Sequence, residues 1–85
     1  MSGSKCTLVL EFNYPRRPKS SLFSVWLFDG DGSPDLEQEV PLQKLPNWVR
    51  VIGPIDQKIA CEVHSGLKKF FEKSGVVVID KGVAD

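Results

Sequence analysis

Residues that build metal sites and disulfides are scarce in this 85-residue sequence, which contains two cysteines, Cys6 and Cys61, and a single histidine, His64. These three residues cannot supply the paired ligand motifs that are typical of structural zinc sites. Few cysteines are also typical of proteins in the reducing cytosol, where disulfides are rare. We therefore expect no metal, no cofactor and no disulfide, and a cytoplasmic location.

An excess of charge and long apolar runs are lacking as well. Eleven Lys and Arg residues balance eleven Asp and Glu residues, so no overall field attracts nucleic acid or an anionic membrane. No stretch approaches the roughly 20 apolar residues of a membrane span, and the start lacks the layout of a signal peptide. We expect one small domain over residues 1–85 that does not bind membranes, with frayed ends at residues 1–4 and 81–85.

Residues 53–75 have the pattern of one amphipathic helix. At about 100° per residue, six apolar side chains fall within an arc of roughly 120°. Pro54 suits the first helical position, where its missing N–H costs nothing, and Gly75 can adopt the left-handed conformation that ends a helix. Gly66, inside the helix, costs up to about 1 kcal/mol relative to Ala; either another element approaches closely there or the residue is merely tolerated. The six apolar residues are Ile59, Ala60, Val63, Leu67, Phe70 and Phe71.

Four other stretches have the composition of strands. Residues 5–12 alternate and predict one buried face, residues 22–28 are apolar on both faces, and residues 48–52 and 76–80 are rich in β-branched side chains. Residues 39–42 could add a weak strand, which Pro41 restricts to an edge or a bulge. The helix lies between the last two strands, and this order permits a parallel crossover.

The fold class that follows is α+β: a small four- to five-stranded mixed or antiparallel sheet with one amphipathic helix packed on one face, in the order β-β-(β)-β-α-β. The helix and the sheet should enclose one core between them. The predicted core residues are Leu8, Leu10, Val25, Leu27, Val49, Val51, Ile59, Val63, Leu67, Phe70, Val77 and Ile79.

The segment from Trp26 to Ser33, an apolar strand followed by Asp-Gly-Asp-Gly-Ser, resembles the first motif of the haloacid dehalogenase phosphatase family. The resemblance implies that Asp29 would attack phosphorus and Asp31 would protonate the leaving group. It covers that segment alone, whereas the family needs a longer parallel α/β domain with a further Lys and an acidic metal pair. We favour a Gly/Asp hairpin turn and keep a metal-dependent phosphatase-like fragment as an alternative.

Oxygen-bearing side chains alternate from residue 29 to residue 35, as the ligands of an EF-hand calcium loop do. However, Pro34 stands where that loop requires Gly, and Val40 stands where it requires Glu. An acidic turn therefore fits better than a calcium loop.

Cys61 and His64 are neighbours on the predicted helix, because residues three apart share a face. A Cys–His pair can form a nucleophile or half of a metal site, but the sequence offers no second ligand pair. We expect His64 to be a half-buried packing residue and Cys61 to be an exposed free thiol.

The one concentrated basic stretch is the loop at residues 14–19, which holds Tyr14, Arg16, Arg17 and Lys19 between and beside two prolines. The prolines stiffen the loop, so it loses less entropy when it binds a partner. Arg favours interfaces because its planar fork binds carboxylates and phosphates. These four residues are therefore the predicted partner-binding residues, and the predicted partner is a protein with an acidic surface.

No convincing nucleophile–base pair or phosphate-binding Gly loop is present in the sequence. The function we predict is thus a small non-enzymatic protein-binding module of the inhibitor, adaptor or viral or phage accessory type. A nucleic-acid-binding module that uses the basic loop 14–19 is an alternative, since cations beside an aromatic ring can bind phosphates and stack a base. The phosphatase-like fragment at Asp29 and Asp31 is the other.

Overall fold

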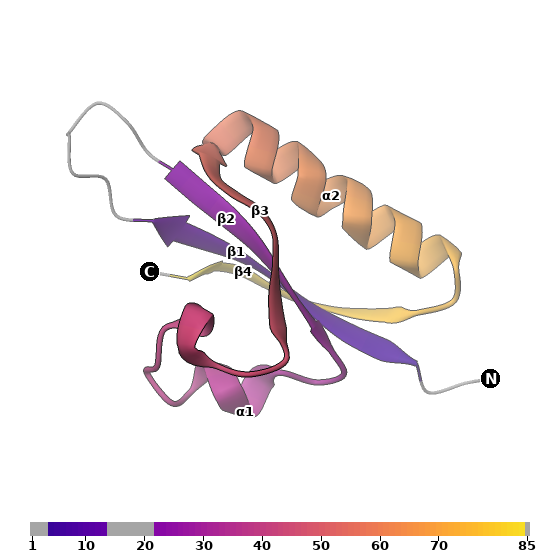
Figure 1. Cartoon of the computed structure of the whole chain (residues 1–85). Helices are drawn as coiled ribbons and strands as arrows, with labels where there is room; N and C mark the ends of the chain where they lie inside the picture. Colours follow the sequence, from indigo (N-terminus) through magenta and orange to yellow (C-terminus); the bar gives the residue numbers. More distant parts are fainter. Residues whose placement is uncertain (1–3, 14–21, 85) are drawn as a thin grey trace.

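The computed structural model describes residues 4–13 and 22–84 of the chain. Its strands β1 (Lys5–Asn13), β2 (Leu22–Asp29), β3 (Trp48–Asp56) and β4 (Val77–Ala84) form one sheet in the order β3-β2-β1-β4 (Figure 1). Helix α2 (Gln57–Lys73) packs on one face of this sheet, and the short helices α1 (Ser33–Leu36) and η1 (Leu42–Lys44) lie on the connection between β2 and β3. The predicted α+β class with a mixed sheet and one main helix is confirmed.

The sheet is mixed because its two edges differ. Strand β2 pairs antiparallel with both β1 and β3, whereas β4 pairs parallel with β1. It follows that β3 and β4 run in the same direction at opposite edges, and α2 crosses the two middle strands to connect them. This is the parallel crossover that the order of the predicted elements permitted. Strand β4 continues past Asp80 to Ala84, which pairs with Glu11.

The main helix begins later than the sequence pattern suggested. Pro54 lies inside β3 instead of at the first helical position, and the N-cap of α2 is Asp56, whose Oδ2 accepts from the Lys58 backbone N–H at 3.0 Å. Two physical reasons account for the difference: Asp is among the best N-cap residues, and Pro is tolerated in an edge strand such as β3. The predicted end is confirmed, since Gly75 has a φ of +90° and its N–H donates to Glu72 O at 3.1 Å.

The sheet has a buried layer on each face. Between the sheet and α2 lies a cluster formed by Leu8, Leu10, Phe23, Val25 and Ala60, with Val63, Leu67 and Phe71 packed against it. On the opposite face lies a second cluster formed by Val9, Trp26, Leu42 and Trp48, with Phe28, Leu36 and Leu45 packed against it. Strand β1 is therefore buried on both faces, and the prediction of one core was incomplete.

The second layer comes from the segment that the sequence left ambiguous. The weak strand expected at residues 39–42 is wrong, because residues 39–41 belong to no helix or strand and η1 begins at Leu42, with Pro41 as its N-cap. The hairpin turn expected after Asp29 is wrong too, since the connection to β3 runs from Gly30 to Asn47. Leu42, which is part of this connection, is 5% exposed and packs against Val9, Trp26 and Trp48. The free energy gained by burying such apolar side chains against the sheet is larger than the local preference of these residues for a tight turn.

Half of the predicted core residues are in the core. Leu8, Leu10 and Val25 are buried, and Leu27, Val63 and Leu67 are half-buried against them. Five predicted core residues are wrong: Val49, Val51, Ile59, Phe70 and Val77 are 58%, 40%, 50%, 62% and 61% exposed. Ile79 is half-buried.

Each error has a geometric reason. Val49 and Val51 lie on β3, an edge strand that α2 does not fully cover. Phe71 instead of Phe70 packs inward, because α2 is rotated so that its buried face centres on Ala60, Val63 and Leu67. In β4 the alternation is shifted by one residue, so Val78 packs towards α2 and Val77 does not.

Gly53 in β3 is required by both its conformation and its surroundings. Its φ is +121°, and a Cβ at this position would lie 2.6 Å from Ser24 Cα and 2.7 Å from Phe23 O. The pairing of β2 with β3 shifts register at this point, between Phe23 and Val25.

We expect Gly53→Ala to lower the free energy of unfolding by about 1–3 kcal/mol, because the methyl group adds strain at a positive φ and meets backbone atoms that cannot move aside. Urea unfolding followed by tryptophan fluorescence measures this change. The matched control is Gly66→Ala, since a Cβ there meets no atom within 4 Å. That variant should gain about 0.5–1 kcal/mol from helix propensity. Equal stability of the two variants would contradict this role of Gly53.

Candidate functional site

The predicted partner-binding residues Tyr14, Arg16, Arg17 and Lys19 lie outside the described residues. They belong to the segment that connects β1 to β2 in the sequence. Their role stays a prediction.

The acidic turn uses its carboxylates within the local structure. Asp31 Oδ1 accepts from the Ser33 backbone N–H at 2.9 Å, and Asp35 Oδ2 accepts from Trp48 Nε1 at 3.1 Å. Within residues 4–13 and 22–84, no three His, Cys, Asp or Glu side chains are grouped so as to hold a metal ion. Strand β2 is antiparallel to both of its neighbours, whereas the dehalogenase motif belongs to a parallel sheet.

Thr7 holds this turn against β1. Its fully buried hydroxyl donates to Gly30 O and accepts from the Gly32 N–H, both at 2.8 Å. Gly32 packs so closely on the indole of Trp48 that a Cβ would collide with the ring. The turn therefore joins the first strand to the second buried layer, a role that the local sequence did not reveal because Thr7 is distant along the chain.

The surroundings of Asp31 lower the pKa of its carboxyl below the ordinary value of 3.8, chiefly through the hydrogen bond from the Ser33 backbone N–H. The Ser33 hydroxyl and the cations Lys5 and Lys81 act in the same direction, although the carboxyl is fully exposed.

A lowered pKa in the folded state means that Asp31 adds stability above its unfolded pKa and loses that stability as the pH falls through the folded value. We expect the Asp31 carboxyl to titrate below 3.8, which carboxyl-detected NMR can measure. Ser33→Pro removes both donors of Ser33 at a position where helices accept Pro, and it should raise the pKa towards 3.8. A pKa that does not change in this variant would show that Ser33 is not the cause.

His64 lies beside Asp80 of β4. Its Nε2 lies 3.3 Å from Asp80 Oδ1 without a well-aligned hydrogen bond, and Lys68 Nζ lies 3.5 Å from Asp80 Oδ2. The prediction of a half-buried packing histidine is confirmed, as is the exposed free thiol of Cys61. Sequence reasoning missed Asp80 because it lies on a different element.

Cys6 lines a hollow of about 290 Å³ at the C-terminal end of α2, together with Ser4, Lys5, Leu27, Asp29, Phe71 and Val76. Burial raises the pKa of the Cys6 thiol, and the negative charge of Asp29 raises it further. Since a thiolate is the reactive form, this environment suppresses nucleophilic chemistry at Cys6.

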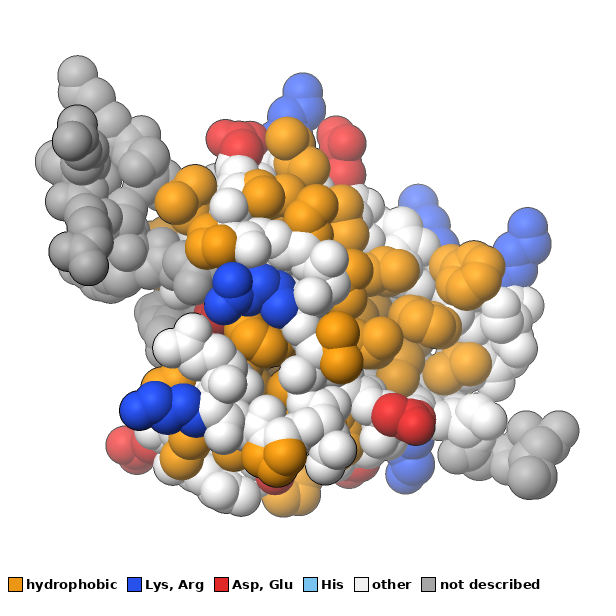
Figure 2. Space-filling view, in the orientation of Figure 1, with side chains coloured by type: hydrophobic (Ala, Val, Ile, Leu, Met, Phe, Trp, Pro, Cys, Tyr) orange, Lys and Arg blue, Asp and Glu red, His pale blue; other side chains and the backbone are white. Residues whose placement is uncertain are grey.

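Apolar side chains that the fold leaves exposed gather between α2 and β3, as Figure 2 shows. Val49 and Val51 come from β3, and Ile59 and Phe70 come from α2. At about 100° per residue, Ile59, Gly66 and Phe70 fall within an arc of about 40° on the helix. The opposite flank of α2 carries His64 and Lys68, which reach β4. We call these five residues, Val49, Val51, Ile59, Gly66 and Phe70, the α2–β3 surface.

Gly66 marks a gap in the middle of this surface. A Cβ placed on it meets no atom within 4 Å, so packing inside the chain does not require glycine there. A glycine inside a helix costs about 1 kcal/mol relative to alanine. The gap leaves the helix backbone accessible between the side chains of Ile59 and Phe70.

Lysines outnumber acidic residues on the arc of α2 next to this surface. By helical position this arc holds Lys58, Lys69 and Lys73, with Glu62 as its acidic member, and all four side chains are exposed. The α2–β3 surface therefore has an apolar centre and a basic margin.

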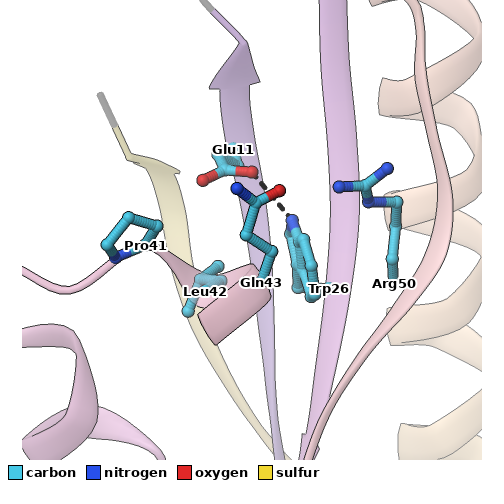
Figure 3. Close-up of a pocket in the computed structure, with 6 residues that line it drawn as sticks. All are labelled: Glu11, Trp26, Pro41, Leu42, Gln43 and Arg50. Atoms are coloured by element: carbon cyan, nitrogen blue, oxygen red, sulfur yellow. Dashed lines mark hydrogen bonds between the residues drawn. The ribbon is translucent and has the colours of Figure 1, made fainter. Parts of the chain in front are cut away.

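A second hollow, of about 220 Å³, lies on the opposite face of the sheet beside Trp26 (Figure 3). Trp26 Nε1 donates to Glu11 Oε1 at 2.8 Å, and Arg50 Cζ lies 5.0 Å from the centroid of the Trp26 ring. Residues of η1 and its N-cap complete the lining, namely Pro41, Leu42 and Gln43. We call it the Trp26 hollow; it brings together residues of β1, β2, β3 and η1 that the sequence gave no reason to group.

None of the helices in the described part of the chain is long and apolar enough to cross a membrane. Comparisons of the chain with protein-family models, with curated proteins and with solved structures find no match.

Proposed function

We propose that the chain is a small non-enzymatic protein-binding module, and that an acidic amphipathic helix of another protein docks on the α2–β3 surface. The observation that carries this proposal is the exposure of four large apolar side chains on adjoining parts of α2 and β3. Apolar side chains scattered singly over a surface need no explanation, but a contiguous group with a polar margin is typical of interaction sites.

The energetic case depends mainly on Phe70 and Ile59. Phe70 is 62% exposed and Ile59 is 50% exposed, so both leave apolar area in contact with water in the free chain. Removing such area from water contributes about 25 cal/mol per Å². Aromatic side chains at the centre of an interface are frequent anchors, whose loss costs about 2 kcal/mol or more.

The margin of the surface favours an acidic partner over a second copy of this chain. In a two-fold dimer the same patch faces itself, so Lys58, Lys69 and Lys73 would be brought towards their own equivalents. An acidic partner would instead pair with these cations. The basic segment 14–19, predicted from the sequence to contact an acidic protein surface, would match the same partner.

A helix suits the surface better than a bulky loop would. Apolar residues at helical spacing can cover the exposed apolar side chains of the α2–β3 surface while the flanks of the partner helix stay polar. At Gly66 the backbone of the partner helix can approach closely, because no side chain stands between Ile59 and Phe70. In this way the function accounts for a glycine that costs stability in the free chain.

The test uses a synthetic amphipathic helical peptide with a leucine stripe flanked by Glu, and calorimetry to measure its dissociation constant. We expect Val49→Ser and Phe70→Ser each to weaken binding, Phe70→Ser by about 2 kcal/mol. The matched control is Val77→Ser, because Val77 is an equally exposed valine in β4, at 61% against 58% for Val49. Circular dichroism should show that all three variants are folded.

Four outcomes would contradict the proposal. If Val49→Ser and Val77→Ser weaken peptide binding equally, the α2–β3 surface is not the binding site. If a peptide with Lys in place of the flanking Glu binds equally well, the partner need not be acidic. If the native chain forms a concentration-dependent dimer in sedimentation experiments and Phe70→Ser abolishes it, a second copy of the chain occupies the surface. Complete loss of binding in an Arg16→Ala, Arg17→Ala double variant, with none in Phe70→Ser, would place the contact on the basic segment.

A further inference from the structure

We propose that the Trp26 hollow binds a small zwitterion of the amino-acid or short-peptide class, with its ammonium group at Glu11 and its carboxylate at Arg50. The hollow is on the face of the sheet opposite α2, so this inference does not depend on the α2–β3 surface. It depends on the two charges that the hollow presents and on how each is held.

Glu11 is positioned by the indole of Trp26. The Nε1–H of Trp26 donates to Oε1 of Glu11 at 2.8 Å, which directs the carboxylate along the wall of the hollow. An ionised carboxylate has two oxygens and about four acceptor sites, so this one bond leaves capacity for a ligand. Trp26 itself is 4% exposed and therefore serves as a fixed support.

Arg50 is positioned by the same indole. Its Cζ lies 5.0 Å from the ring centroid, within the range of a cation–π contact. A hydrogen bond of 3.4 Å from Nη1 to Gly53 O occupies one of its donors. A guanidinium has five donors in a planar fork that matches a carboxylate, so most of its capacity is available to an anionic ligand.

The two charges do not neutralise each other. Among residues 4–13 and 22–84, no ion pair joins Glu11 to Arg50, whereas His64 and Lys68 both lie within 4.0 Å of Asp80. Glu11 and Arg50 stand on either side of Trp26, as Figure 3 shows. A ligand with one group of each sign can satisfy both, whereas a ligand of single charge leaves one unmatched.

The size and the remaining lining fit a small molecule. The hollow of about 220 Å³ equals the volume share of roughly seven water molecules, which is enough for an amino acid or a short peptide. Gln43 can donate and accept hydrogen bonds, and Pro41 and Leu42 contribute an apolar wall. Most of the hollow thus matches a polar ligand with little apolar area.

The probe is glycine, compared with diglycine and triglycine, added at millimolar concentrations while the two indole N–H resonances are followed by NMR. We expect a saturable shift of the Trp26 resonance and little change at Trp48, whose indole N–H is bonded to Asp35 and which does not line the hollow. The probe with the lowest dissociation constant shows whether the hollow prefers an amino acid or a short peptide. Acetate and methylammonium, at matched ionic strength, should bind at least about tenfold more weakly, since each lacks one charge-assisted contact.

Variants of the two charged residues complete the test. Glu11→Gln keeps an acceptor for Trp26 Nε1 but removes the charge, and Arg50→Gln removes the guanidinium; each should raise the dissociation constant by about tenfold or more. Lys44→Gln, which removes an exposed cation outside the hollow, is the control and should leave it unchanged. The proposal is overturned by the absence of any Trp26 shift in the native chain, by acetate binding as tightly as the zwitterions, or by equal effects of the three variants.

Discussion

The burial of β1 on both of its faces is the constraint on which the rest of the structure depends. Leu8 and Val9 are consecutive in the chain, point to opposite faces and are both inaccessible to solvent. The strand is also paired along both edges, with β2 and β4. A strand in that position needs a cover on each face, so α2 supplies one and the connection between β2 and β3 supplies the other.

Several polar residues that could have formed a catalytic or metal-binding motif instead hold the structural elements together. Asp31 and Asp35 stabilise the start of the connection, and Thr7 ties that connection to β1 through two hydrogen bonds. His64 lies against Asp80 at the junction of α2 and β4. A short chain has few polar side chains. Those that hold structural elements together are less available for binding or catalysis.

The candidate binding regions arise where the two covers end. Helix α2 spans from one edge of the sheet to the other (Figure 1). Phe70 on α2 and Val49 on β3 stay exposed, and Gly66 leaves a gap on the exposed side of the helix. On the opposite face, η1 covers Trp26 but leaves a hollow between itself and Arg50. Because the two regions lie on opposite faces, substitutions in one should leave the other intact.

Local patterns in the sequence determined the four strands, the main helix and the fold class, but not the connection between β2 and β3. Alternation in β1, the two-sided apolar run of β2, and the 3.6-residue period of α2 with Gly75 at its end all predicted correct elements, because neighbouring residues produce these signals. Only the tertiary structure decided which faces are covered, since burial depends on residues distant in sequence. For this reason Phe70 and Phe71 were indistinguishable in the pattern, as were Val77 and Val78. The grouping of Glu11, Trp26 and Arg50 was equally out of reach, because it follows from the order of strands in the sheet.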